Sequence, residues 1–113
     1  MPSSRRSPTP AVVALRVAVE DSCRQLRDQV RQQARLIRSG AAGELTQADV
    51  ERLAEDITVA ARARLDAAAP PGQGPSADQE LQATHREAAK IMALMAREAA
   101  AVLHKAWRAR QKA

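Results

Sequence analysis

Apolar residues recur along this chain at helical spacing, in three separate stretches. In the first stretch they step by three and four residues, as on one face of an α-helix. The stripe consists of Val12, Leu15, Val19, Cys23, Leu26, Val30, Ala34 and Ile37. We therefore expect an amphipathic helix over about 10–39, capped by Thr9 with Pro10 at its first position, and ended by Gly40.

Two further helices are predicted after this one. Thr46 and Asp49 form a capping box that Leu45 and Val50 bracket, so the second helix should begin near residue 47 and run to about 69. Its apolar stripe contains Val50, Leu53, Ala54, Ile57, Ala61 and Leu65. A Pro- and Gly-rich linker over 70–76 precedes a second capping box, Ser76 with Gln79, and a third helix over about 77–111. The inward positions of that helix are Leu81, Ala88, Ile91, Met92, Met95, Ala99, Val102, Leu103 and Ala106.

These elements predict an all-α fold with one helical domain over 10–113, preceded by a flexible basic arm over 1–9. Short connections favour antiparallel neighbours, so the first two helices should form a hairpin. The third helix either folds back on the hairpin or pairs with another subunit. The first stripe has an eleven-residue period, whereas Leu81, Ala88, Met95 and Val102 repeat every seven residues, as in a coiled coil.

The composition predicts a thin core. The 113 residues include 26 alanines and one tryptophan, with no Phe or Tyr. Large side chains supply most of the area that folding removes from water, and small domains bury the lowest fraction of their surface. We therefore expect an elongated bundle that self-associates as a homo-oligomer or joins a larger assembly.

Positive charge is concentrated on the first helix. Five arginines, at spacings of three, four, four and three, would form one row about 20 Å long. This arginine ladder consists of Arg24, Arg27, Arg31, Arg35 and Arg38. Like charges at these spacings repel, so the ladder requires countercharge. In an antiparallel hairpin Glu51 and Glu55 lie near Arg31 and Arg35 and could supply it; the alternative is an external polyanion. Fifteen arginines beside three lysines are also typical of a GC-rich genome.

A second cluster of cations surrounds the single tryptophan at the C-terminus. It comprises Lys105, Trp107, Arg108, Arg110 and Lys112. Basic residues at a helix C-terminus are also favoured by the helix dipole. The tryptophan ring could stack on a base, lie at a membrane headgroup layer, anchor a protein interface, or close the end of the bundle by packing on Leu103.

The sequence proposes no catalytic residues, cofactor or metal ligands. His85 and His104 are too far apart to share a metal on one helix, and Cys23 has no spaced partner. Arg97 and His104, six residues intervening, resemble the Arg and His pair of HEPN-type ribonucleases, which implies metal-independent RNA cleavage. The resemblance is confined to that pair, and Leu103 stands where a polar residue would adjoin the histidine. Any two residues seven apart share a helical face, so a non-enzymatic protein is favoured.

No segment approaches the ~20 apolar residues of a membrane span, and Arg16 interrupts the only run that imitates a secretory signal. A lone cysteine in an apolar stripe favours a reducing compartment, hence a cytoplasmic location. The sequence predicts an accessory protein that contacts a nucleic-acid backbone, without sequence preference, through the arginine ladder and the C-terminal cations. The alternative is a protein-only adaptor that docks an acidic partner.

Overall fold

Three α-helices make up the computed structural model, which describes residues 10–68 and 79–113. They are α1 (Pro10–Ser39), α2 (Gln47–Ala68) and α3 (Gln79–Gln111), and no strand occurs within the described ranges. The all-α prediction is confirmed, and the predicted helix bounds agree with the structure wherever residues are described. The predicted arm over 1–9, the linker over 70–76 and the Thr9 and Ser76 caps lie outside the described residues.

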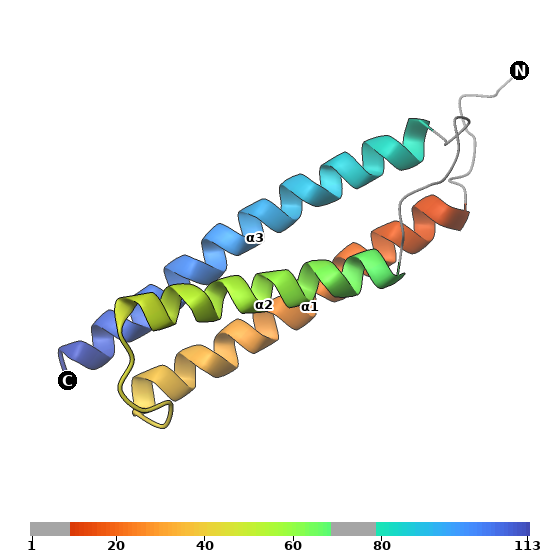
Figure 1. The fold of residues 1–113 in the computed structure, drawn as a ribbon. Helices are drawn as coiled ribbons and strands as arrows, with labels where there is room; N and C mark the ends of the chain where they lie inside the picture. The colour runs from red at the N-terminus through yellow and green to blue at the C-terminus, as the bar shows by residue number, and fades with distance from the viewer. Residues whose placement is uncertain (1–9, 69–78) are drawn as a thin grey trace, which may run out of the picture.

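The three helices form an elongated bundle. α2 returns antiparallel to α1, and α3 turns back again, so that α1 and α3 run parallel (Figure 1). Every pair of helices is in contact, and the principal extents are 65 × 25 × 16 Å. The third helix therefore folds back on the hairpin of its own chain.

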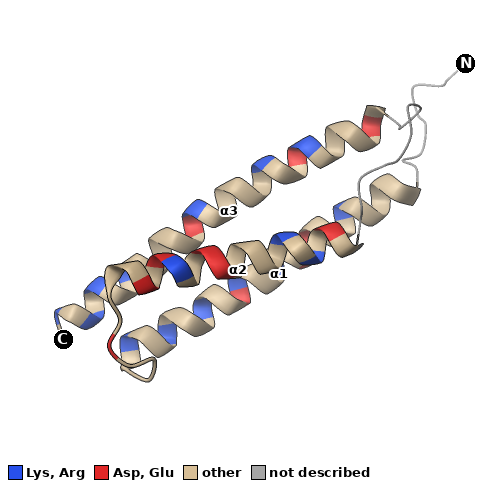
Figure 2. Ribbon diagram, in the orientation of Figure 1, with Lys and Arg blue, Asp and Glu red and all other residues tan. Residues whose placement is uncertain are grey.

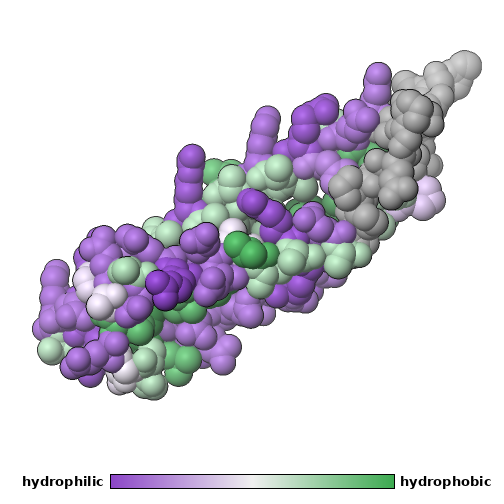
Figure 3. Space-filling model, in the orientation of Figure 1, coloured by the Kyte–Doolittle hydropathy of each residue, from purple (hydrophilic) through white to green (hydrophobic). Residues whose placement is uncertain are grey.

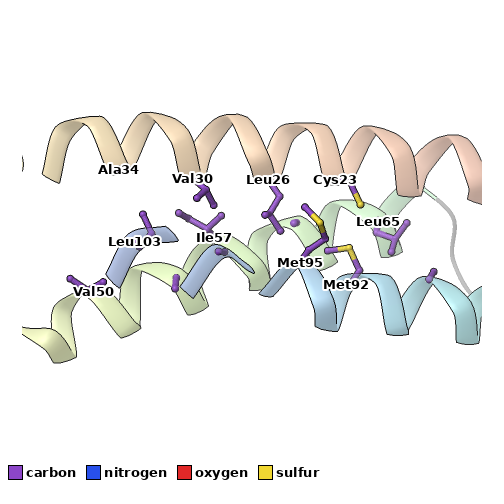
Figure 4. Packing of buried hydrophobic residues seen from close by; sticks show 14 of the residues in the cluster. Cys23, Leu26, Val30, Ala34, Val50, Ile57, Leu65, Met92, Met95 and Leu103 are labelled. Atoms are coloured by element: carbon purple, nitrogen blue, oxygen red, sulfur yellow. The ribbon is translucent and has the colours of Figure 1, made fainter. Parts of the chain in front are cut away.

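All three helices contribute to a single core (Figure 4). Leu15, Leu26, Met92 and Leu103 are among its largest fully buried side chains, and alanines fill much of the rest. The predicted stripes are confirmed in outline, although five of their members are only partly buried: Val19, Leu53, Leu81, Ile91 and Val102.

Polar residues that the stripes omitted also enter the core. The hydroxyl of Thr58 donates to the carbonyl of Ala54 at 2.9 Å, and that of Thr84 donates to the carbonyl of Glu80 at 2.7 Å. A hydroxyl that bonds the preceding turn of its own helix can be buried without leaving a polar group unsatisfied.

The buried face of α3 follows an eleven-residue period. Its buried residues are Thr84, Ala88, Met92, Met95, Ala99, Leu103 and Ala106, spaced four, four and three twice over. This period suits nearly straight helices. The predicted seven-residue repeat coincides with it at Ala88 and Met95, whereas Leu81 and Val102 are only partly buried.

Local signals at the α1–α2 connection define the end of α1 and the start of α2, and the predicted bounds agree with the structure at both places. Gly40 has a positive φ of 82°, as expected for the residue that ends α1. The Asp49 amide donates to Thr46 Oγ1 at 3.1 Å, and the Thr46 amide donates to Asp49 Oδ2 at 2.9 Å, which completes the capping box. The hydrogen bonds from the Thr46 amide and hydroxyl group lower the pKa of the Asp49 carboxyl.

Within the described ranges, no helix has an apolar stretch long enough to cross a membrane.

Candidate anion-binding surface

The arginine ladder is exposed along its whole length. All five of its side chains lie on the surface of α1. Arg24 Nη1 lies 3.6 Å from Asp21 Oδ1, with both side chains largely in solvent, and this is the only ion pair within 4 Å among the residues that the structure describes. The expected pairing of Arg31 and Arg35 with Glu51 and Glu55 is therefore not formed.

The acids of α2 fail to neutralise the ladder because they lie on the other side of α3. Glu51 and Glu55 line a groove between α2 and α3. Arg27 and Arg31 line a different groove, between α1 and α3, together with Glu98. The sequence could show which residues share a helical face, but not which neighbouring helix that face adjoins.

The α1–α3 groove combines an apolar floor with charged rims. Leu26, Val30, Met95 and Val102 line the stretch that Arg27 and Arg31 border. The groove continues toward the start of α1 past Val19, Cys23 and Ile91, and then past Ala88. Its charged residues are Arg16, Arg24, Arg27 and Arg31 with Glu20, Asp28, Glu87 and Glu98. Three ladder arginines, Arg24, Arg27 and Arg31, thus border an apolar groove.

The parallel course of α1 and α3 brings the two predicted basic clusters to the same end of the bundle. We call this region the basic end; its exposed cations are Arg31, Arg35, Arg38, Lys105, Arg108, Arg110 and Lys112. Residues 29–39 and 99–111 contain no Asp or Glu. Figure 2 shows basic residues along α1 and at the C-terminal end of α3, while acidic residues mark the first half of α2. The two predicted basic clusters, which are far apart in the sequence, therefore lie at the same end of the bundle.

Trp107 is held inside the protein at this end. Its indole Nε1 donates a hydrogen bond to the carbonyl oxygen of Leu45 at 2.7 Å, and its half-buried ring packs against the core. This geometry favours the interpretation that Trp107 closes the end of the bundle. The ring ties α3 to the connection between α1 and α2.

Arg110 also contacts that connection. A Cβ atom built on Gly40 would lie 2.7 Å from Arg110 Nη2, so the guanidinium group covers the glycine that ends α1. Trp107 and Arg110 therefore help to position the basic end. The side chains of Lys105, Arg108, Arg110 and Lys112 are all exposed.

Cys23 faces the core from α1 and is only 9% exposed. Burial raises the pKa of its thiol, although the positive charge of Arg27 acts in the opposite direction. Its thiol is therefore protonated at neutral pH, as expected for a packing residue.

The residues that the structure describes contain no group of three His, Cys, Asp or Glu side chains that could hold a metal ion. Arg97 is exposed and His104 is half-buried on α3, next to the fully buried Leu103.

Two polar side chains were missed by sequence reasoning. Arg64 and His85 are half-buried, and Arg64 Nε and Nη2 and His85 Nε2 have no hydrogen-bond partner in this structure of the described ranges. Neither residue interrupts an apolar stripe, so no local pattern pointed to their burial.

No protein-family model, curated protein or solved structure is significantly similar to the chain. A functional assignment therefore depends on the geometry described above.

Proposed function

We propose that this chain is a small, non-enzymatic, self-associating helical protein that contacts a nucleic-acid backbone, in a reducing compartment such as the cytoplasm. The contact surface consists of the arginine ladder and the basic end. The observation that carries the proposal is that two parallel helices bring basic residues to the same end of the bundle (Figure 2), while among the described residues no carboxylate lies within 4 Å of any ladder arginine except Arg24.

The size of the surface suits a polyanion. The ladder spans about 21 Å from Arg24 to Arg38, and duplex DNA of that length carries roughly twelve phosphate charges. Contacts to phosphates position a protein without reading sequence, so the binding would be sequence-neutral. Trp107 has a structural part in this proposal, because its indole N–H is already bonded to Leu45.

The helix dipole does not account for the ladder. Its effect is confined to about the last turn of a helix. Arg38 lies in the last turn of α1, whereas Arg24, Arg27 and Arg31 lie two to four turns before the end. These three arginines repel one another, and the helix dipole does not offset that repulsion. We therefore propose that they bind an anion outside the chain.

The direct test is fluorescence anisotropy with a labelled 20-base-pair duplex and a single strand of the same length. Wild-type protein should bind both at low salt. The triple variant Arg24→Gln, Arg27→Gln, Arg31→Gln should bind at least tenfold more weakly. A matched pair of single variants, Arg27→Gln in the ladder and Arg52→Gln outside it, removes equal charge at the two places, and Arg52→Gln should bind nearly as well as wild type. Equal loss in the two variants would show that net charge alone is responsible.

The apolar floor of the α1–α3 groove favours one second candidate, the protein-only adaptor. Phosphates make no use of Leu26, Val30 and Met95, whereas an acidic amphipathic helix would cover them and meet Arg27 and Arg31 on the rim. A synthetic amphipathic helix of Leu and Glu tests this candidate. If it binds with micromolar affinity and neither nucleic acid binds at low salt, the adaptor interpretation replaces the first. RNA that is cleaved by wild-type protein in EDTA, but not by His104→Ala, would contradict both.

A further inference from the structure

The α2–α3 groove has an apolar floor that the single chain leaves uncovered. Ala54 and Thr58 of α2 and Ala96 and Ala100 of α3 line it, and the neighbouring Val59 is 58% exposed. Ala89 and Ala93 continue the strip along α3 at helical spacing. Figure 3 shows the result as a band of apolar surface across the middle of the molecule, where α2 and α3 adjoin. Small side chains allow another helix to approach closely.

The two sides of this groove carry opposite charge. On α2, Glu51 and Glu55 line the groove, and Asp66 lies farther along at helical spacing. On α3, Arg86, Lys90 and Arg97 are exposed beside the alanine strip, on the side away from α2. Two of the three acids of α3 lie elsewhere, since Glu87 and Glu98 line the α1–α3 groove. Arg62 is the one cation among the acids of the α2 side.

These charges are self-complementary. Because α2 and α3 are antiparallel and Thr58 and Ala96 line the same groove, Glu55 is level with residue 99 and Asp66 with residue 88. Arg97 is then within two residues of the level of Glu55, about 3 Å along the axis. Arg86 and Lys90 are each two residues along α3 from the level of Asp66, which is again about 3 Å along the axis. A second α2, laid over α3 in the direction of the first, would therefore place acids beside cations.

We propose that the α2–α3 groove is the interface of a homodimer whose two-fold axis runs along the length of the bundle. Such an axis places α2 of each copy over α3 of the other, so that Glu55 of one copy meets Arg97 of the other. A two-fold axis across the bundle would instead stack α2 on α2 and oppose acids with acids. The charge pattern therefore selects both the occupant and its orientation.

The available area suits a stable dimer. α2 is 22 residues long, so it covers about 33 Å, and two adjacent helices are roughly 20 Å wide. The footprint of roughly 650 Å² per copy approaches the about 800 Å² per partner of a standard interface. This axis leaves both arginine ladders on the outside and directs both basic ends the same way. The inference specifies the self-association within the proposed function but does not require nucleic acid.

The test is sedimentation equilibrium of the full chain without nucleic acid. Wild type should have twice the mass of the 12.2 kDa chain. Glu55→Arg and Arg97→Glu should each raise the dissociation constant at least tenfold, because each opposes like charges. The double variant Glu55→Arg, Arg97→Glu exchanges the signs and should return to within threefold of wild type. The matched control, Arg27→Glu with Glu98→Arg, alters the α1–α3 groove and should leave the dimer unchanged.

Circular dichroism verifies that each variant is folded. A wild-type chain that remains monomeric at 100 μM would overturn the inference, as would a double variant no better than the single ones. Dissociation of the α1–α3 control would also overturn it, because a different surface would then hold the dimer. Anisotropy of the wild-type sample with duplex DNA reports separately on the proposed function: an intact wild-type dimer without DNA binding contradicts that function alone.

Discussion

The two grooves that border α3 share one helix and one core, yet they differ in what the chain supplies to them. In the α1–α3 groove the basic rim comes from α1, and its cations continue onto the basic end beyond the last acidic residue of either helix. In the α2–α3 groove the acids lie on α2 and the exposed cations beside it lie on α3. The basic end beyond the α1–α3 groove has no acidic residue on either of these helices and suits a different molecule, whereas the α2–α3 groove complements a copy of itself.

The difference shows why net charge is a poor guide to the binding surfaces of this chain. The formal charge of +5 conceals an acidic half of α2 and a basic flank on α1. Helix direction decides how these segments combine. The parallel course of α1 and α3 joins their basic ends, and the antiparallel course of α2 keeps its acidic half near that same end.

Loss of the shared core should have the largest effect, because both surfaces depend on it. Leu103 is fully buried, and Leu103→Ala should lower the free energy of unfolding by about 2–5 kcal/mol. Urea denaturation followed by circular dichroism measures the change. Leu94→Ala is the matched control, since Leu94 is 63% exposed, and it should change stability by no more than about 0.5 kcal/mol. Similar losses in both variants would mean that the described core is wrong.

Backbone strain at the end of α1 should have the next largest effect. Gly40 has φ of 82°, and Gly40→Ala should cost about 1–2 kcal/mol because an L side chain disfavours that conformation. The clash with Arg110 should add little, since a guanidinium at the end of a flexible side chain can move aside. In an Arg110→Ala background the cost should therefore change by less than about 0.5 kcal/mol. A neutral Gly40→Ala would contradict the assigned conformation.

The cap of α2 tests the acidic side alone. Thr46→Ala should destabilise the protein by about 1 kcal/mol at neutral pH, because the amide of Asp49 loses its acceptor. Thermal unfolding measures this change. Nucleic-acid binding by the folded variant should be unaltered, since the ladder lies on α1.

The same cap gives stability a dependence on pH. The pKa of Asp49 is lowered in the folded state, so its contribution is present above the unfolded pKa of about 4 and is lost as pH falls through the folded value. Asp49→Asn should therefore lose less stability than wild type between pH 5 and pH 2. Equal losses in the two proteins would show that the cap carboxylate does not contribute.

The smallest effect should be a gain. The ladder variant Arg24→Gln, Arg27→Gln, Arg31→Gln removes like-charge neighbours and one exposed ion pair with Asp21, so it should raise the free energy of unfolding by roughly 0.5–1 kcal/mol. Urea denaturation in 10 mM salt measures it. A loss above about 1 kcal/mol would indicate that carboxylates of the chain already match these arginines.

The helices could be predicted from the sequence, but the way in which they pack on one another could not. The bounds of α1 and the start of α2 were predictable because Pro10, Gly40, Thr46 and Asp49 are local signals that act within a few residues. The relation between α1 and α3 depends on contacts such as those of Leu26 with Met95 and Ile37 with Trp107, which are about 70 residues apart. Alanine-rich faces fit one another in many registers, so no local pattern specified this pairing.

The same limit applies to the candidate site. The exposure of the ladder followed from its place beside the apolar stripe. The lack of countercharge from α2 could not be predicted in the same way, because Glu51 and Glu55 lie across α3 from Arg27 and Arg31. The bond from Trp107 to Leu45 spans 62 residues, and only the folded bundle shows that the tryptophan closes the end of the core.

The salt dependence of duplex binding tests the central claim, that the ladder arginines serve an anion outside the chain. We predict that log K falls linearly with log salt with a slope of about −4 or steeper for wild type, and that the ladder variant loses about 2.7 of this slope, three contacts at about 0.9 each. A wild-type slope near zero, or the same slope in the ladder variant, would contradict the claim.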